Sequence, residues 1–314
     1  MKKQMIITLY TILFVVVFIA SALLSMNITG SAPQKLLNVD YNGSVYTNLS
    51  YKNANEHKYD LYLPENINME ETQNLILFIH GGSFNSGSKE EFEAWCRYYA
   101  AKGYITATVD YTLQNQGMDA DLNLMNEEIK NCVNAIDEYC QTIGIDIKGM
   151  AVSGVSAGGT LALNYAYKCA QSSAIPVKFV FQLAAPAYFE PDEWGILMRV
   201  NKIETQREFV EIMTGVQITD EQMKSGEYKK YIDEISPSML VDITSVPTLC
   251  GYGLKDHLVP ASSRETLIAA LESNNVAFDY IPFPNSNHGM YADLDALQEF
   301  IDLSLVYCDR YFNQ

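Results

Sequence analysis

Segments of apolar and polar residues alternate along the chain in a way that predicts strands and helices in turn. Residues 74–79 (Asn-Leu-Ile-Leu-Phe-Ile) form a continuous apolar run, typical of a strand covered on both faces. Residues 45–51 and 58–63 alternate apolar with polar residues, as half-exposed antiparallel edge strands do. Further strands are predicted at 104–109, 149–153, 178–183, 248–251 and 277–281, and helices at 90–102, 119–142, 157–169, 262–274 and 292–311. This order predicts an α/β fold whose mostly parallel eight-stranded sheet is flanked by helices.

One stretch departs from this alternation. Residues 186–245 separate two predicted core strands and carry a helical pattern with several large apolar residues. Connections of that length within a domain are uncommon and often functional. We therefore expect a helical cap insertion at about 186–245, with a surface excursion as the alternative.

The N-terminus differs in composition from the rest. Two lysines precede an apolar run at residues 5–26, which fits a signal peptide and is also long enough for an N-terminal membrane anchor. Residues 1–26 are therefore assigned to one of these, 27–44 to a polar linker and 45–314 to the folded domain. Either reading predicts an exported protein, secreted or tethered to the outer face of the cytoplasmic membrane, with possible membrane association through residues 5–26.

Charge and cysteine content narrow the choice of partners and cofactors. The net charge of −17 opposes binding to phosphate backbones, so nucleic acid is not an expected partner. The six cysteines are far apart and lack metal-ligand spacing, so we expect buried free thiols and neither a metal nor another cofactor. The sequence leaves the oligomeric state open.

The strongest chemical signal is residues 154–159, Gly-Val-Ser-Ala-Gly-Gly, between a predicted strand and a predicted helix. In that context the pattern G-x-S-x-G forms a sharp turn that exposes the serine, and the glycines remove side chains that would collide. Ser156 is therefore the candidate nucleophile. A Gly-rich turn without catalytic function is the alternative reading.

A serine hydroxyl needs a base to become a good nucleophile, and histidine is the usual one. The chain has four histidines, and the order serine, acid, histidine along such folds favours His288, which follows a late strand. The acid should follow the strand before it, where Asp256 lies, and would orient the imidazole without taking its proton. Asp242 is the second candidate acid, and His257 is expected to be a solvent-exposed neighbour.

A glycine-rich loop follows the most apolar strand. It reads His80-Gly-Gly-Ser-Phe, and glycines allow the backbone to approach a reacting carbonyl so that its N–H groups stabilise the developing oxyanion. His80 is predicted to fix this loop rather than to transfer protons. His57 lies before the first core strand and is not a candidate base.

Together these motifs resemble the α/β-hydrolase esterases, in particular those related to hormone-sensitive lipase and the carboxylesterase and acetylxylan or feruloyl esterase-like hydrolases. The resemblance extends from about residue 58 to the C-terminus and rests on 59–64, the loop at 80–84, 109–111, 143–146, the turn at Ser156, 247–248 with 256–260, and 288–289. Two positions depart from the pattern, Ser83 where a third glycine is common and Thr112 where arginine is common.

The resemblance implies the α/β-hydrolase fold, a triad of Ser156, Asp256 and His288, and an oxyanion hole formed by the amides of Gly82, Ser83 and Ala157. The expected activity is hydrolysis of short-chain acyl or acetyl esters, with a small-molecule ester as substrate. A serine peptidase of the same fold and a non-catalytic, membrane-tethered binding module are the alternatives.

Overall fold

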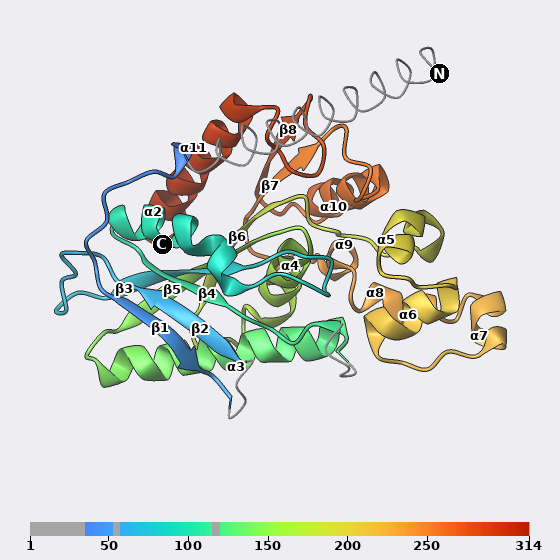
Figure 1. Ribbon diagram of the computed structural model, residues 1–314, viewed down its shortest axis with the longest axis horizontal. Helices are drawn as coiled ribbons and strands as arrows, with labels where there is room; N and C mark the ends of the chain where they lie inside the picture. The colour runs from blue at the N-terminus through green and yellow to red at the C-terminus, as the bar shows by residue number, and fades with distance from the viewer. Residues whose placement is uncertain (1–34, 53–56, 115–119, 314) are drawn as a thin grey trace, which may run out of the picture.

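The computed structural model describes residues 35–52, 57–114 and 120–313 and contains one eight-stranded sheet (Figure 1). The strands lie in the order β1-β2-β4-β3-β5-β6-β7-β8. Their bounds are β1 Val45–Ser50, β2 Lys58–Tyr62, β3 Gln73–Ile79, β4 Ile105–Val109, β5 Ile147–Val155, β6 Val177–Leu183, β7 Thr248–Gly253 and β8 Phe278–Phe283. β2 pairs antiparallel with β1 and β4, and the remaining pairs are parallel. The predicted α/β fold and its mostly parallel sheet are confirmed.

The prediction that both N-terminal strands are edge strands is right for β1 and wrong for β2. β2 lies second in the sheet and is buried along most of its length. Its polar residue Asp60 faces the interior, where it accepts a hydrogen bond from the Asn48 backbone and pairs with Lys89, with 3.1 Å between Oδ2 and Nζ. A buried ion pair thus produced an alternation that we interpreted as solvent exposure.

Helices cover both faces of the sheet. Their bounds are η1 Lys89–Phe92, α2 Glu93–Ala101, α3 Leu122–Thr142, α4 Ala157–Cys169, η3 Pro191–Glu193, α5 Gly195–Val200, α6 Gln206–Thr214, α7 Asp220–Ser225, α8 Lys229–Asp233, α9 Pro237–Leu240, α10 Ala261–Ser273 and α11 Leu294–Tyr311. α3, α4 and α10 pack on one face, and α2 and α11 on the other. Alternate residues of β3 join the two cores, Leu77 on one face and Phe78 on the other, which explains its continuous apolar run.

Side-chain caps set where several helices begin. α3 begins at Leu122 rather than at the predicted position 119, because the Asp121 carboxylate accepts hydrogen bonds from the amides of Asn123 and Leu124. α6 begins after Thr205, whose hydroxyl accepts from the amide of Glu208.

The connection between β6 and β7 forms a helical insertion, residues 184–247, containing α5 to α9. In Figure 1 its yellow and orange helices lie beside the sheet, at the opposite side from β1. Trp194 is buried at the centre of the insertion, where its ring stacks with those of Phe189 at 5.2 Å and Phe209 at 6.5 Å. These aromatic side chains belong to the apolar core on one face of the sheet, which therefore extends into the insertion.

The N-terminal predictions fall largely outside the described residues, including the signal peptide or anchor at 1–26. Within the described ranges, no helix has the length and apolar character needed to cross a bilayer. The described part of the expected linker packs against the domain, since Leu37 is buried and the Tyr41 hydroxyl donates to the Leu63 carbonyl. The packed chain therefore begins before residue 45.

Candidate active site

Ser156 lies at the sharp turn between β5 and α4. Its backbone has φ 55° and ψ −125°, a conformation that costs a non-glycine residue about 1–3 kcal/mol. A Cβ on Gly154 would lie 2.3 Å from the Gly158 carbonyl oxygen, and one on Gly158 would lie 2.0 Å from that of Ile79. The glycines on either side of the serine are thus required by close backbone contacts.

The structure brings Ser156, His288 and Asp256 together in one hydrogen-bonded row. His288 Nε2 lies 2.9 Å from Ser156 Oγ, and His288 Nδ1 lies 2.8 Å from Asp256 Oδ2. The other carboxylate oxygen, Oδ1, accepts from the amides of Leu258 and Val259. The carboxylate is therefore fixed from behind while its free oxygen faces the imidazole.

The second candidate acid, Asp242, and the histidines at positions 57 and 257 lie elsewhere. His257 is exposed, as expected, and Asp242 is an exposed loop residue whose carboxylate accepts from Thr244. His57 is buried, with its Nε2 2.8 Å from Glu128 Oε1. None of these side chains takes part in the row formed by Ser156.

His80 is buried beneath the glycine-rich loop. Its ring stacks on Tyr111 with centroids 4.3 Å apart, and its Nδ1 lies 2.8 Å from the Gly81 carbonyl oxygen. Burial lowers the pKa of His80, and burial also raises the pKa of the adjacent Asp110 to about 6. The Tyr111 hydroxyl donates to the His80 carbonyl, so Tyr111 helps to hold the start of the glycine-rich loop, a role that the sequence did not reveal.

The glycine-rich loop runs against Ser156 in an unusual backbone conformation. Gly82, Ser83 and Phe84 have φ values of 109°, 54° and 64°, all in the region that non-glycine residues disfavour. A Cβ on Gly81 would lie 3.3 Å from that of Ser156, so the loop approaches the serine closely. The loop therefore passes beside the hydroxyl and the first turn of α4.

A cavity of about 530 Å³ opens at Ser156. Apolar side chains form most of its wall, and the exposed side chain of Glu91 also lines it. The lining residues are Gly81, Gly82, Ser83, Glu91, Phe92, Trp95, Val155, Ser156, Leu183, Leu258, His288, Gly289, Met290, Tyr291 and Leu297. Trp95 and Phe92 carry no sequence signal beyond the apolar face of a helix, and we did not predict their place here.

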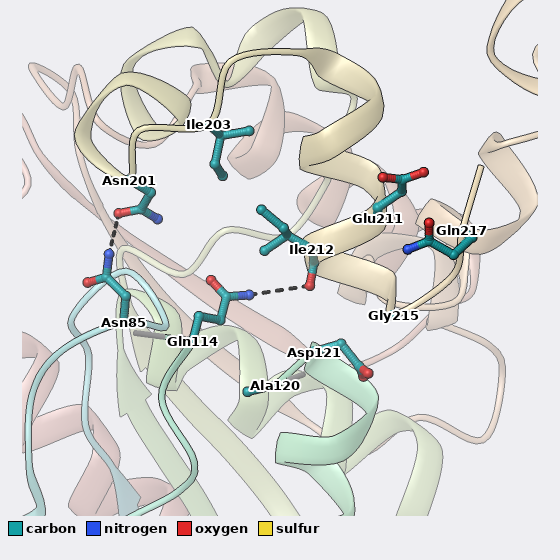
Figure 2. A pocket seen from close by; sticks show the side chains of 10 residues that line it. All are labelled: Asn85, Gln114, Ala120, Asp121, Asn201, Ile203, Glu211, Ile212, Gly215 and Gln217. Carbon is teal, nitrogen blue, oxygen red and sulfur yellow. Dashed lines mark hydrogen bonds between the residues drawn. The ribbon is translucent and has the colours of Figure 1, made fainter. Parts of the chain in front are cut away.

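A second cavity, of about 570 Å³, lies between the insertion and the body of the domain (Figure 2). Its wall includes Asn85 from the glycine-rich loop and Asn201 and Glu211 from the insertion. Asn85 and Asn201 point toward one another there and are hydrogen-bonded (Figure 2). The insertion thus contacts the loop that borders Ser156.

No group of histidine, cysteine, aspartate and glutamate side chains that could hold a metal ion occurs among residues 35–52, 57–114 and 120–313. All six cysteines lie in these ranges as free thiols; five are buried and Cys169 is half-buried.

Comparison with known families adds an independent observation. The model of the BD-FAE family matches residues 59–271, more than half of the chain, including the glycine-rich loop and the turn at Ser156. The chain belongs to the BD-FAE family. With its fold, this makes it an esterase-like α/β-hydrolase, as the motifs indicated.

Solved structures share the fold of this BD-FAE member. Esterase B from Lactobacillus rhamnosis superposes with a TM-score of 0.67 at 17% identity, covering 92% of this chain and 95% of its own. A truncated carbohydrate esterase from gut microbiota gives a TM-score of 0.68 at 17% identity, covering 87% and 97%. At these identities the likeness shows the fold.

Curated relatives match shorter segments of this BD-FAE protein. Esterase LipI of Mycobacterium tuberculosis is 30% identical over 110 residues, 35% of this chain and 33% of its own. Kynurenine formamidase of Danio rerio is 29% identical over 113 residues, 36% and 35% respectively. The alignment thus spans about a third of either relative, and only 6% of the non-reducing polyketide synthase atr1 of Stereocaulon alpinum.

Proposed function

We propose that this protein is a serine carboxylic ester hydrolase. The observation that carries the proposal is the row of hydrogen bonds from Ser156 Oγ through His288 to Asp256. A buried carboxylate, a histidine and a serine on a strained turn form an arrangement suited to nucleophilic acyl transfer.

In the proposed reaction Ser156 Oγ attacks the ester carbonyl while His288 Nε2 accepts its proton. His288 then gives this proton to the leaving alcohol as the ester C–O bond breaks, and the acyl group remains as an ester on Ser156. His288 next accepts a proton from a water molecule that attacks this ester and returns the proton to Ser156 Oγ as the acid leaves. Asp256 keeps the proton of the neutral ring on Nδ1, so that Nε2 is free to accept. It also stabilises the imidazolium that forms.

The proposed oxyanion donors are the backbone amides of Gly82, Ser83 and Ala157. Two features support this assignment. The loop that carries Gly82 and Ser83 approaches Ser156 closely, and Ala157 begins α4, where the first amides have no partner within the helix. The positive end of the α4 dipole adds to the stabilisation of negative charge at this position.

The proposed substrates are short-chain acyl or acetyl esters. The cavity at Ser156 has room for a small acyl group and an apolar wall in which Leu183, Leu258 and Met290 take part. The related proteins named esterase are consistent with ester substrates.

The test is replacement of Ser156 by alanine. Turnover of p-nitrophenyl acetate and butyrate should fall by about 10⁴- to 10⁶-fold, equivalent to roughly 5–8 kcal/mol, because the nucleophile is lost. Circular dichroism and thermal melting check that the variant is folded. A folded S156A protein with undiminished esterase activity would refute the proposal.

The two alternatives give different results in parallel assays. A peptide panel cleaved more efficiently than the ester panel would favour a serine peptidase. A folded wild-type protein that fails to react with a fluorophosphonate probe would favour a binding module.

We also propose that the protein is exported, on the composition of residues 1–26. Cell fractionation and the mass of the mature chain test this. A full-length chain in the cytosol would contradict it.

A further inference from the structure

The glycine-rich loop beside Ser156 has a strained backbone conformation that neighbouring contacts must stabilise. Ser83 and Phe84 are consecutive non-glycine residues with φ values of 54° and 64°. L-residues disfavour this region, so the conformation persists only where surrounding contacts over-determine it. Contacts with neighbouring groups must therefore fix the two peptide planes that flank Ser83.

The first plane, which carries the Ser83 amide, is fixed within the loop. The Gly82 carbonyl oxygen accepts from the amides of Asn85 and Ser86, each at 3.0 Å, and from the Ser86 hydroxyl at 2.9 Å. Because a carbonyl and the following amide share one rigid plane, these bonds set the direction of the Ser83 N–H.

The second plane is fixed from outside the loop. The side chain of Asn201 donates from Nδ2 to the Ser83 carbonyl oxygen at 3.3 Å, and its Oδ1 accepts from Asn85 Nδ2. Figure 2 shows the Asn85 and Asn201 side chains pointing toward one another at the left of the view, joined by this hydrogen bond. The next carbonyl along, that of Phe84, accepts from the Gln114 amide at 3.0 Å.

Asn201 is itself held firmly in the insertion. It is the C-terminal cap of α5, and its backbone N–H donates to the Leu197 carbonyl at 2.9 Å. Leu197 is buried in the apolar core, so the helix end is anchored. The Asn201 side chain thus connects this helix end to the glycine-rich loop by hydrogen bonds, beside the apolar contact of Phe84 with Phe189, whose ring centroids lie 6.3 Å apart.

We infer that Asn201 is a positioning residue that holds the oxyanion hole in its active geometry by fixing the Ser83–Phe84 peptide plane. This inference rests on the proposed function and deepens it. Without the bond to its carbonyl, Ser83 is free to relax from positive φ. Because this torsion joins the two planes, the relaxation also strains the hydrogen bonds of the Gly82 carbonyl and displaces the Ser83 amide from the substrate oxygen. Asn201 acts through the loop and touches no reacting atom.

The test compares Asn201→Ala and Asn201→Asp with the wild type on p-nitrophenyl butyrate. The aspartate can still accept from Asn85 but cannot donate to the Ser83 carbonyl. Both variants should lower kcat about 10-fold and leave KM within about 2-fold, because the loss falls on transition-state stabilisation. Val200→Ala, which truncates the exposed neighbour on the same helix, is the matched control and should retain wild-type kcat.

Two further measurements distinguish positioning from a general structural role. Affinity for a boronic acid, whose serine adduct is tetrahedral, should fall by about the same factor as kcat. The Asn201→Ala substitution should lower kcat much less in a Ser83→Gly background than in the wild type, since glycine adopts positive φ without an anchor. Thermal melting of each variant checks folding.

Unchanged kcat in either Asn201 variant, beside an active wild type, would overturn the inference and leave the proposed function standing. A rise in KM alone, or equal loss with and without Ser83→Gly, would also overturn it. Absence of ester hydrolysis by the wild type would instead refute the proposed function.

Discussion

The Asp256→Asn substitution tests how the carboxylate controls His288. In the structure Asp256 Oδ1 accepts from the amides of Leu258 and Val259, and Oδ2 faces His288 Nδ1 at 2.8 Å. An asparagine must keep its carbonyl oxygen toward the two amides, which places its NH₂ group against the ring. His288 Nδ1 then has to accept, and the proton of the neutral ring moves to Nε2.

That tautomer cannot accept the proton of Ser156. We therefore expect kcat to fall about 10⁴-fold near neutral pH, equivalent to about 5.5 kcal/mol, as for the same change in a serine-protease triad. The fold should persist, because the asparagine keeps the shape of the side chain and both bonds from the amides. The substitution should therefore lower the rate of the chemical step and leave the free energy of unfolding nearly unchanged.

The assay is single-turnover and steady-state hydrolysis of p-nitrophenyl acetate, with thermal melting as the check of folding. Asp242→Asn is the matched control, since this exposed carboxylate was the other candidate acid. It should leave kcat within about 2-fold. A folded D256N protein with near wild-type kcat, or a large loss in D242N, would refute the reasoning.

Two other predictions concern stability. Gly158→Ala should lower the free energy of unfolding by about 3 kcal/mol or more, because the new Cβ would lie 2.0 Å from the Ile79 carbonyl oxygen. Gly195→Ala is the control and should change the free energy of unfolding little, because a Cβ there would lie in open space. Urea titration measures both. Asp110→Asn should stabilise the protein increasingly as the pH rises from 4 to 7. Burial raises the pKa of Asp110 from 3.8 to about 6, so the folded state loses stability as this carboxyl ionises. We expect about 1–2 kcal/mol for this 25% exposed side chain, and a pH-independent difference between the two proteins would contradict it.

Most helices and strands could be predicted from the sequence because their apolar periodicity agrees with the faces that the fold buries. Each predicted strand and helix recurs within a few residues, since apolar periodicity reports which faces are buried. The place of β2 in the sheet was predicted wrongly, because Asp60 is buried in an ion pair with Lys89, a partner 29 residues away that periodicity cannot reveal. The position of a strand within the sheet depends on such pairing.

The candidate site was predictable where residue type and order carry the chemistry. Ser156, Asp256 and His288 follow the ends of β5, β7 and β8, and parallel strands bring those ends to one edge of the sheet. Asn201 could not be found in this way. It lies 118 residues from Ser83 at the end of a short helix, where asparagine is unremarkable, and only the folded insertion reveals the contact.

The insertion leaves one strand of the sheet and returns on its neighbour. β6 and β7 pair in parallel, with Leu183 opposite Gly251, so the insertion also carries the crossover from the carboxyl end of β6 to the amino end of β7. Chimeras that exchange residues 184–247 with those of other hydrolases should keep their strand register only where the replacement spans the same crossover. The residues that line the cavity at Ser156 lie outside this segment, so such exchanges should act on the reaction through the contact of position 201 with the glycine-rich loop.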